Sequence, residues 1–484
     1  MAKTKITSGV SGLLRKTMKI SIIEGAFAQI YMSLSGPGSV FITRFAVLLN
    51  ASPFHFGLLS AIGQLSQVFQ PIGAIITRPM TSRKGMVLFF ALTGRLMTLF
   101  LGILPFILFD FNAMALFLGL FFVSTTLQAI AGNAWIAWIS DSFPLRIRGR
   151  FFSVRSRYLL IIGLLTGLLA AGFIDGFEKR KIIITPQFLT NIFLKTTDDT
   201  NLATGFLLLF SFATLIGVVG ISILKKQPEN HKSVETESLI SMFSVPFKDG
   251  NFLRLLLFTC WWMLAVGIGA PFWQPFMLNK LQMSLSKVQF YGVTSTIAQL
   301  VVLKKWGKFI DRFGNKTAMA IAILLGGFNP MVWLVVSPSR YWLVYFEAVT
   351  SGIMWAGAGI VAVNFVLALA PDKRRQVYSG IHGAVSGLAM MFTMILSGWL
   401  LPYVPMIYSG RFAAEQVLFG MTGLFRWSAL IPLLLIHDVR APKLNEMIIF
   451  FRQYSKVRMT QLADRMFRYL PFISGNQNSR KLDD

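Results

Sequence analysis

Apolar stretches of about 20 residues recur along this chain, and short polar segments separate them. An α-helix needs about 20 consecutive apolar residues to cross the hydrocarbon core of a bilayer. Twelve segments meet this requirement, at residues 20–46, 55–77, 85–109, 112–139, 152–174, 203–224, 253–278, 287–306, 317–337, 341–369, 377–401 and 417–437. The bilayer offers no hydrogen-bond partners to the backbone, so a spanning segment must satisfy its own. The sequence therefore predicts an all-α polytopic membrane protein with twelve transmembrane helices.

The composition agrees with a membrane protein. Hydrophobic residues make up 54% of the chain and charged residues 14%, whereas soluble proteins have about 25% charged residues. The net charge of +26 would suit a nucleic-acid partner. The basic residues instead gather at the ends of the predicted spans, where they determine topology, so we expect no nucleic-acid partner. The single cysteine, Cys260, lies in an apolar run and rules out a disulfide framework.

The distribution of lysine and arginine predicts how the chain is oriented. When the amino terminus is placed inside, the inner segments hold most of these residues. Both termini are therefore expected in the cytoplasm, with the protein in a bacterial inner membrane. The predicted organisation is a cytoplasmic segment at 1–19, a six-helix bundle at 20–224, a cytoplasmic linker at 225–250, a second six-helix bundle at 251–437, and a cytoplasmic basic amphipathic tail at 438–484. We expect this tail to lie on the anionic inner leaflet.

The two halves share short patterns in the same order. The matched elements are Pro37 with Pro271, Phe56-Gly57 with Tyr291-Gly292, and Gln64-Leu65 with Gln299-Leu300. Each match is weak by itself, but their order and spacing are nearly constant. They indicate two pseudo-symmetric bundles related as parallel repeats, an architecture typical of one large transporter fold.

The segment 307–316 resembles the signature of the major facilitator superfamily. That signature consists of a glycine, an acidic residue followed by a basic one, a second glycine and another basic residue, in the loop joining two spans. The matching positions in the second half are Gly307, Asp311, Arg312, Gly314 and Lys316.

The first half matches the signature less well. The equivalent loop keeps Arg78 but has Thr77 at the acidic position, so Asp141 is the substitute acid that we expect near Arg78 or Arg83. The resemblance implies a gate at Asp311 and Arg312 that holds one face of the protein closed. The alternative is that these charges only determine topology.

Two carboxylates inside predicted spans are candidates for proton coupling. Ionisable groups in the bilayer are costly, and by default they mark functional sites. Glu24 lies in the first span and Glu347 in the tenth. Burial favours the protonated form of a carboxyl group, which suits a proton carrier. The alternative is that each carboxylate caps or pairs at a helix end.

The resemblance also implies a central cavity lined by spans 1, 4, 7 and 10. Polar and aromatic residues at membrane depth are the candidates for its walls. They are Tyr31, Gln128, Trp262, Trp355, Asn364 and Arg426. Arg426 is too deep to reach the interface easily, so we expect it to pair with a carboxylate or with backbone carbonyls.

The resemblance implies a secondary active transporter that works by alternating access. A cavity poor in charge favours a small organic, amphipathic solute, and the intramembrane carboxylates favour proton coupling. A uniporter and a non-transporting protein of the same fold, such as an assembly factor or a sensor, stay open as alternatives. The sequence has no phosphate-binding glycine loop, metal-ligand cluster or recognisable nucleophile, so we expect no cofactor, no metal and no enzymatic activity. The expected partners are a small-molecule substrate and the lipid bilayer, with the protein as a monomer.

Overall fold

The computed structural model describes residues 12–68, 82–106, 113–141, 145–181, 199–229, 245–371, 374–408 and 410–436. The predicted tail at 438–484, most of the linker and Arg78 lie outside these residues.

The helices of more than eight residues are α1 (Gly12–Ser35), α2 (Val40–Leu48), α3 (Pro53–Val68), α5 (Lys84–Ile103), α6 (Ala113–Asp141), α7 (Leu145–Glu178), α9 (Thr200–Leu224), α11 (Gly250–Gly269), α13 (Leu285–Val332), α14 (Leu343–Leu369), α15 (Arg375–Leu400) and α17 (Ala414–Ser428). Shorter pieces are η1 (Leu104–Phe106), η2 (Pro246–Lys248), α12 (Trp273–Pro275), the π-helical η3 (Phe276–Lys280), η4 (Pro338–Arg340), η6 (Leu401–Tyr403), α16 (Val404–Ile407) and α18 (Leu430–Leu434).

The all-α, multi-pass prediction is confirmed. Within the described residues, eight helical segments are long and apolar enough to cross a membrane. The described residues of the other four predicted spans lie mainly in α1 and α2, in α3, and in the two arms of α13.

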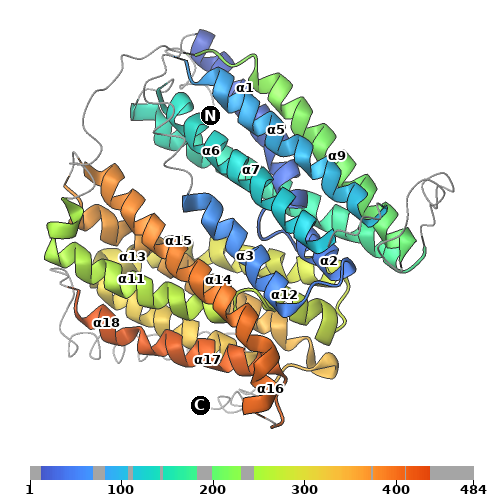
Figure 1. Cartoon of the computed structure of the whole chain (residues 1–484). Coiled ribbons are helices and arrows are strands. Elements are labelled where there is room, and N and C mark those ends of the chain that lie inside the picture. Colours follow the sequence, from blue (N-terminus) through green and yellow to red (C-terminus); the bar gives the residue numbers. More distant parts are fainter. Residues whose placement is uncertain are drawn as a thin grey trace, which may run out of the picture.

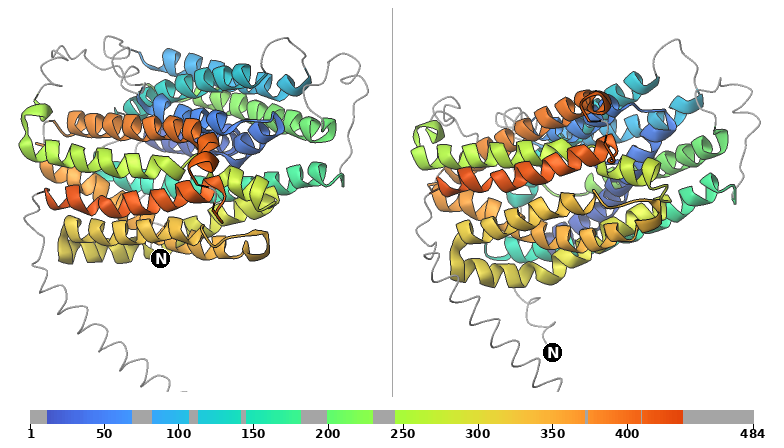
Figure 2. Two further views of the ribbon diagram at one scale, coloured as in Figure 1. Left: turned by 60° about the horizontal axis from the view of Figure 1, so that its bottom comes forward. Right: turned by 90° about the horizontal axis from the view of Figure 1, so that it is seen from below.

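The helices form two groups that lie side by side (Figure 1). One group contains α1, α5, α6, α7 and α9, and the other contains α11, α13, α14, α15 and α17. Helix α3 belongs to the first half of the chain but packs closely against α15 of the second half. Figure 2 shows that the long helices of both groups run in roughly the same direction, as expected for spans that cross one bilayer.

We distinguish the two ends of this assembly by their charge. The basic end is where α1 begins, with Lys16 and Lys19, and where α9 ends, followed by Lys225 and Lys226. The opposite end is where α7 ends and α9 begins.

Both repeated prolines interrupt a helix near the opposite end. Pro37 lies between α1 and α2, where Gly38 has a φ of +78° and Ser39 caps α2 by accepting a hydrogen bond from the Phe41 backbone. Pro271 lies between α11 and α12. Proline lacks the backbone N–H and clashes with the preceding turn, so it ends a helix where no other element compensates. The predicted span at 20–46 is therefore divided into α1 and α2.

The segment 307–316 differs from its prediction as a short loop. Helix α13 runs from Leu285 through this segment to Val332, and Gly314 is its one residue with a non-helical conformation, at φ 80° and ψ 169°. A residue with a side chain is strained at such a φ, whereas glycine adopts it readily. The turn between the two spans is therefore concentrated at one glycine.

The hydrophobic core differs between the two ends. One large cluster unites both halves and includes Phe45 and Phe206 of the first half with Phe276, Trp333 and Phe419 of the second. The remaining clusters of the described residues each belong to one half. Apolar burial therefore joins the halves mainly at the opposite end.

Candidate functional site

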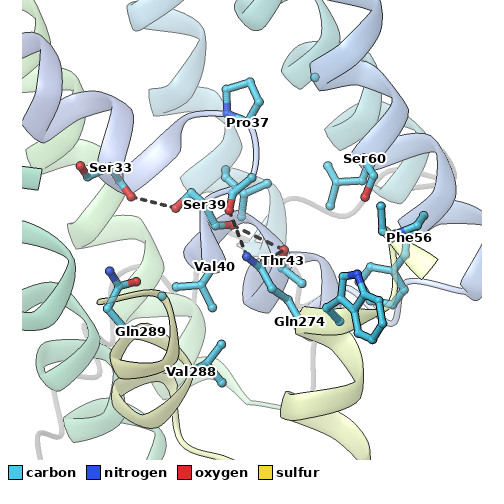
Figure 3. Close-up of a pocket in the computed structure, with 18 of the residues that line it drawn as sticks. Ser33, Pro37, Ser39, Val40, Thr43, Phe56, Ser60, Gln274, Val288 and Gln289 are labelled. Carbon is cyan, nitrogen blue, oxygen red and sulfur yellow. Dashed lines mark hydrogen bonds between the residues drawn. The ribbon is translucent and has the colours of Figure 1, made fainter. Parts of the chain in front are cut away.

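A cavity of about 800 Å³ lies between the two halves. Its walls come from α1, α2, α3, α6 and α7 of the first half and from the Pro271 break, α12, η3, α13 and α15 of the second (Figure 3). Its polar side chains are uncharged, and they are Ser33, Ser39, Thr43, Ser60, Gln64, Gln274, Gln289, Tyr291 and Thr296. Its apolar side chains include Met32, Phe56, Met277, Met390 and Met394. No Asp, Glu, Lys, Arg or His is among the described lining residues.

Hydrogen bonds between the two helix breaks close the cavity at the opposite end. The Thr43 hydroxyl donates to Gln274 Oε1 at 2.5 Å, and Gln274 Nε2 donates to the Gly38 carbonyl at 3.1 Å. Figure 3 shows Thr43 and Gln274 pointing toward each other across the seam. The helix break at Pro37 and the helix break at Pro271 thus contact each other directly, because both expose backbone and polar groups near the opposite end.

Asp175 forms a second link between the halves. It lies near the end of α7, it is only 6% exposed, and its two carboxylate oxygens accept from the backbone N–H groups of Leu285 at 2.8 Å and Ser286 at 3.1 Å. These two residues begin α13, and Ser284 at the N-cap forms no side-chain cap of its own. The first N–H groups of a helix lack partners within it and carry partial positive charge. The carboxylate of one half therefore caps a helix of the other.

The backbones of α3 and α15 contact each other directly at Gly57 and Gly398. A Cβ placed on Gly57 would lie 2.6 Å from the Met394 carbonyl oxygen, and one placed on Gly398 would lie 3.0 Å from the Gly57 Cα. Only glycine permits this approach of the two backbones. The contact lies toward the opposite end, since α3 begins at Pro53.

Glu347 is connected to the cavity through one side chain. Tyr291 lines the cavity, and its hydroxyl donates to Glu347 Oε2 at 2.7 Å. Arg426 lies in the same half, fully inside the bundle, where it donates to the Gly326 carbonyl at 3.0 Å and lies over the Trp262 ring at 5.8 Å. This agrees with the expectation that Arg426 reaches a backbone carbonyl.

Glu24 lies in a buried charge cluster of the first half. Its carboxylate is 3.6 Å from Arg95 of α5 and 3.9 Å from Arg155 of α7. Arg95 also donates to the Gly217 carbonyl of α9 at 2.6 Å, and Arg155 donates to the Ser21 carbonyl at 3.1 Å. The cluster therefore connects α1, α5, α7 and α9, and Glu24 is not among the residues that line the cavity.

None of the predicted wall residues is among those that line the cavity. Tyr31 is fully buried, and its hydroxyl bonds Thr98 at 2.6 Å and accepts from Gln128 at 2.8 Å. Trp262 and Trp355 pack edge to face at 6.4 Å within the core of the second half. Asn364 donates to the Asn315 side chain at 3.1 Å. Their role as substrate contacts stays a prediction.

The predicted gate residues lie at the basic end. Asp311 and Arg312 are exposed on α13, just before the Gly314 break. Lys316 donates to the carbonyls of Leu434 at 2.7 Å and Ile436 at 2.9 Å, so it caps the last span of its own half. Gly307 is helical, and Asp141 is the last residue of α6. The gating role of these residues, and of Arg78 outside the described part, stays a prediction.

The sequence reasoning missed Asp175 and the Thr43–Gln274 contact. The predicted span ended at residue 174 and left Asp175 outside it, whereas α7 continues to Glu178. The signal available was an acidic residue near the end of an apolar run, but its partner is a backbone more than a hundred residues away.

The fold and the cavity together define a multi-pass membrane protein of two helical bundles around a central solute-sized space. Residues 263–446 match the model of the Major Facilitator Superfamily. The match lies in the second half of the chain and covers less than half of its length.

The chain is also similar to three known proteins. It is 27% identical over 157 residues to "Putative sugar transporter ERD6-like 13" of Arabidopsis thaliana, an alignment that spans 31% of this chain and about a third (32%) of that relative. The solved structure of the nucleoside transporter NupG matches with a TM-score of 0.62 at 14% identity, over 88% of this chain and 99% of that one. The structure of a D-xylose-proton symporter matches with a TM-score of 0.60 at 13% identity, over 89% and 98%. At these identities the structural matches show a shared fold.

Proposed function

We propose that this protein is a secondary transporter that moves a small, uncharged, amphipathic organic solute across the membrane by alternating access. The observation that supports this most directly is the cavity of about 800 Å³ at the seam between the two halves. A site at the interface of two repeats can be exposed to either side when the repeats rock against each other.

The chemistry of the lining supports a neutral cargo. A charged solute placed in this space would lose its hydration without gaining a charged partner, which costs several kcal/mol. Hydroxyl and amide groups such as Ser60, Gln64 and Gln289 can bond a polar face, while Met390 and Met394 contact an apolar one. The cargoes named for the similar proteins, a sugar and a nucleoside, are neutral and rich in hydroxyl groups, which fits the same lining.

The conformation described here is the one closed at the opposite end. We place the basic end in the cytoplasm, because lysine and arginine are retained on that side. Both chain termini then lie on the cytoplasmic side of the plasma membrane, and the two-bundle domain organisation of the sequence prediction is retained. The closed outer end and the separate cores toward the basic end correspond to an inward-facing state.

Glu347 is the better of the two coupling candidates. It contacts Tyr291, which lines the cavity, so a change in its protonation can alter the cavity wall. Glu24 pairs with two arginines, so its charge can serve to hold the helices together.

The transport proposal is tested with purified protein in liposomes. Neutral solutes such as D-xylose and uridine are assayed for flux, with lactate and choline as charged comparisons. We expect saturable flux of a neutral solute only. Absence of flux across the neutral panel, with or without a pH gradient, would contradict transport and favour the non-transporting alternative.

The coupling proposal needs a separate measurement. Glu347→Gln is compared with wild type in accumulation driven by a pH gradient and in counterflow, which moves no net protons. We expect the variant to lose accumulation and keep counterflow. Glu178→Gln is the matched control, because its carboxylate pairs with Arg44 within one half. Accumulation that survives in both Glu347→Gln and Glu24→Gln would exclude these two carboxylates as the proton carriers, whereas flux without accumulation in wild type would favour a uniporter.

A further inference from the structure

A groove of about 680 Å³ lies at the basic end, away from the solute cavity. It lies between the beginning of α1 and the end of α9, and the described residues that line it are Lys16, Lys19, Ile20, Ile23, Ile223 and Lys226. Deeper in the membrane the same two helices touch, because a Cβ on Gly220 would lie only 2.8 Å from the Phe27 Cβ. The helices thus separate toward the basic end and leave the groove between them.

The groove lies on a surface that faces lipid. Along α9, Leu215 is 62% exposed and Val219 is 38% exposed, and both lie on the face that continues to Ile223 at helical spacing. On α1, Ile23 is also exposed. Apolar side chains exposed at this depth of a membrane helix contact hydrocarbon rather than water. An apolar path therefore leads from the groove into the bilayer.

The charges of the groove are all positive. Lys16 and Lys19 come from α1 and Lys226 follows α9, and all three are exposed. Within the described part of the chain, the neighbouring carboxylates have other partners. Glu24 is paired with Arg95 and Arg155, and Glu229 accepts from the backbone of Arg83 and Lys84. None of the three lysines forms an ion pair with a described carboxylate.

We propose that this groove binds an anionic phospholipid of the leaflet at the basic end. The lysines lie toward the helix ends, where a headgroup phosphate lies, and Ile23 and Ile223 lie about one turn deeper than Lys19 and Lys226, where acyl chains begin. The phosphate contacts Lys16, Lys19 and Lys226, and one acyl chain follows Ile23 and Ile223 toward Val219. Basic pockets between membrane helices on the cytoplasmic side are suited to such headgroups. Because the lysines come from two helices, the lipid links α1 to α9.

The order of groups favours a lipid over a free anion. A soluble phosphate would use the lysines and leave the apolar floor of the groove without a partner. A zwitterionic lipid would bring a positive choline close to three ammonium groups. Both are therefore expected to bind more weakly than an anionic lipid.

The test uses the full chain, purified in detergent, with retained lipid measured by native mass spectrometry. The probes are palmitoyl-oleoyl phosphatidylglycerol, its phosphatidylcholine counterpart and inorganic phosphate. The triple variant Lys16→Gln, Lys19→Gln, Lys226→Gln is compared with a matched control, Lys248→Gln, Lys304→Gln, Lys305→Gln. The control removes the same charge from three exposed lysines of the second half.

We expect wild type and control to retain phosphatidylglycerol in preference to phosphatidylcholine, and the triple variant to bind it about tenfold more weakly or worse. Millimolar phosphate is expected not to displace it. If the triple variant is not monodisperse, Lys19→Gln and Lys226→Gln are tested singly, and each is expected to weaken retention. Equal retention by wild type and lysine variants, an equal loss in the control, or displacement by phosphate alone would overturn the proposal.

Discussion

The link between Asp175 and the start of α13 allows a quantitative prediction about the conformational equilibrium. Asp175→Asn keeps the shape of the side chain but removes its charge and leaves one oxygen to accept hydrogen bonds. In the native chain both oxygens accept, from Leu285 and Ser286, at 2.8 Å and 3.1 Å. The variant therefore loses about one hydrogen bond to a charged group, together with the attraction between the carboxylate and the helix N-terminus.

A hydrogen bond to a charged group contributes about 1.5–3 kcal/mol. Asp175 is almost fully buried, so solvent does not screen this contribution. Because the bond joins the two halves, its loss destabilises only states in which the opposite end is closed. The ratio of open to closed states at that end should rise about 10- to 100-fold, since about 1.4 kcal/mol corresponds to a factor of ten.

The assay is cysteine accessibility from the outer side. Cys260 is replaced by serine, and a cysteine is placed at Ser60, which lines the cavity. The rate of labelling by a membrane-impermeant maleimide in oriented vesicles reports opening. Asp199→Asn is the control, because Asp199 caps α9 within its own half, accepting from Leu202 at 3.0 Å. Unchanged labelling in Asp175→Asn, or an equal rise in Asp199→Asn, would refute the reasoning.

Four further predictions concern individual residues. Gly398→Leu should force α3 and α15 apart and raise the same labelling rate, whereas Gly383→Leu on the same helix, where a Cβ meets nothing within 4 Å, should not. Arg95→Met should leave Glu24 with one partner fewer in the bundle and lower the free energy of unfolding by about 3–5 kcal/mol. The more exposed Arg44–Glu178 pair should contribute about 0–1 kcal/mol when Arg44→Met is measured in the same thermal unfolding assay. Lys316→Met should lower stability by about 1–3 kcal/mol through loss of its two carbonyl contacts, and an unchanged unfolding temperature would argue against that cap.

The fold was accessible to sequence reasoning because a bilayer restricts the choices of the chain. Every spanning segment must be a helix that satisfies its own backbone, so hydropathy alone locates the spans. The prolines at 37 and 271 were matched as a repeat inside two continuous predicted spans, and the structure shows that each interrupts its helix. The segment 307–316 was misjudged as a loop because its polar residues are compatible with a helix, and only Gly314 has to leave it.

The candidate site was less accessible because its contacts are distant in sequence. Glu24, Glu347 and Arg426 could be singled out as buried charges, since charge in a membrane is costly wherever it lies. Their partners could not be assigned, because Arg95, Tyr291 and the Gly326 carbonyl come close only through the packing of separate helices. The uncharged groups that line the cavity gave no signal, because serine and glutamine occur throughout such spans.

The sequence by itself determined that this chain is a helical membrane protein of two related halves, because hydrophobicity and proline act over one helix at a time. Only the tertiary structure decided which end is closed, through the hydrogen bonds from the start of α13 to Asp175 of α7 and from Thr43 to Gln274. It also decided that the space between the halves is uncharged. Both features depend on which faces of two bundles meet, and no local property of the chain specifies that.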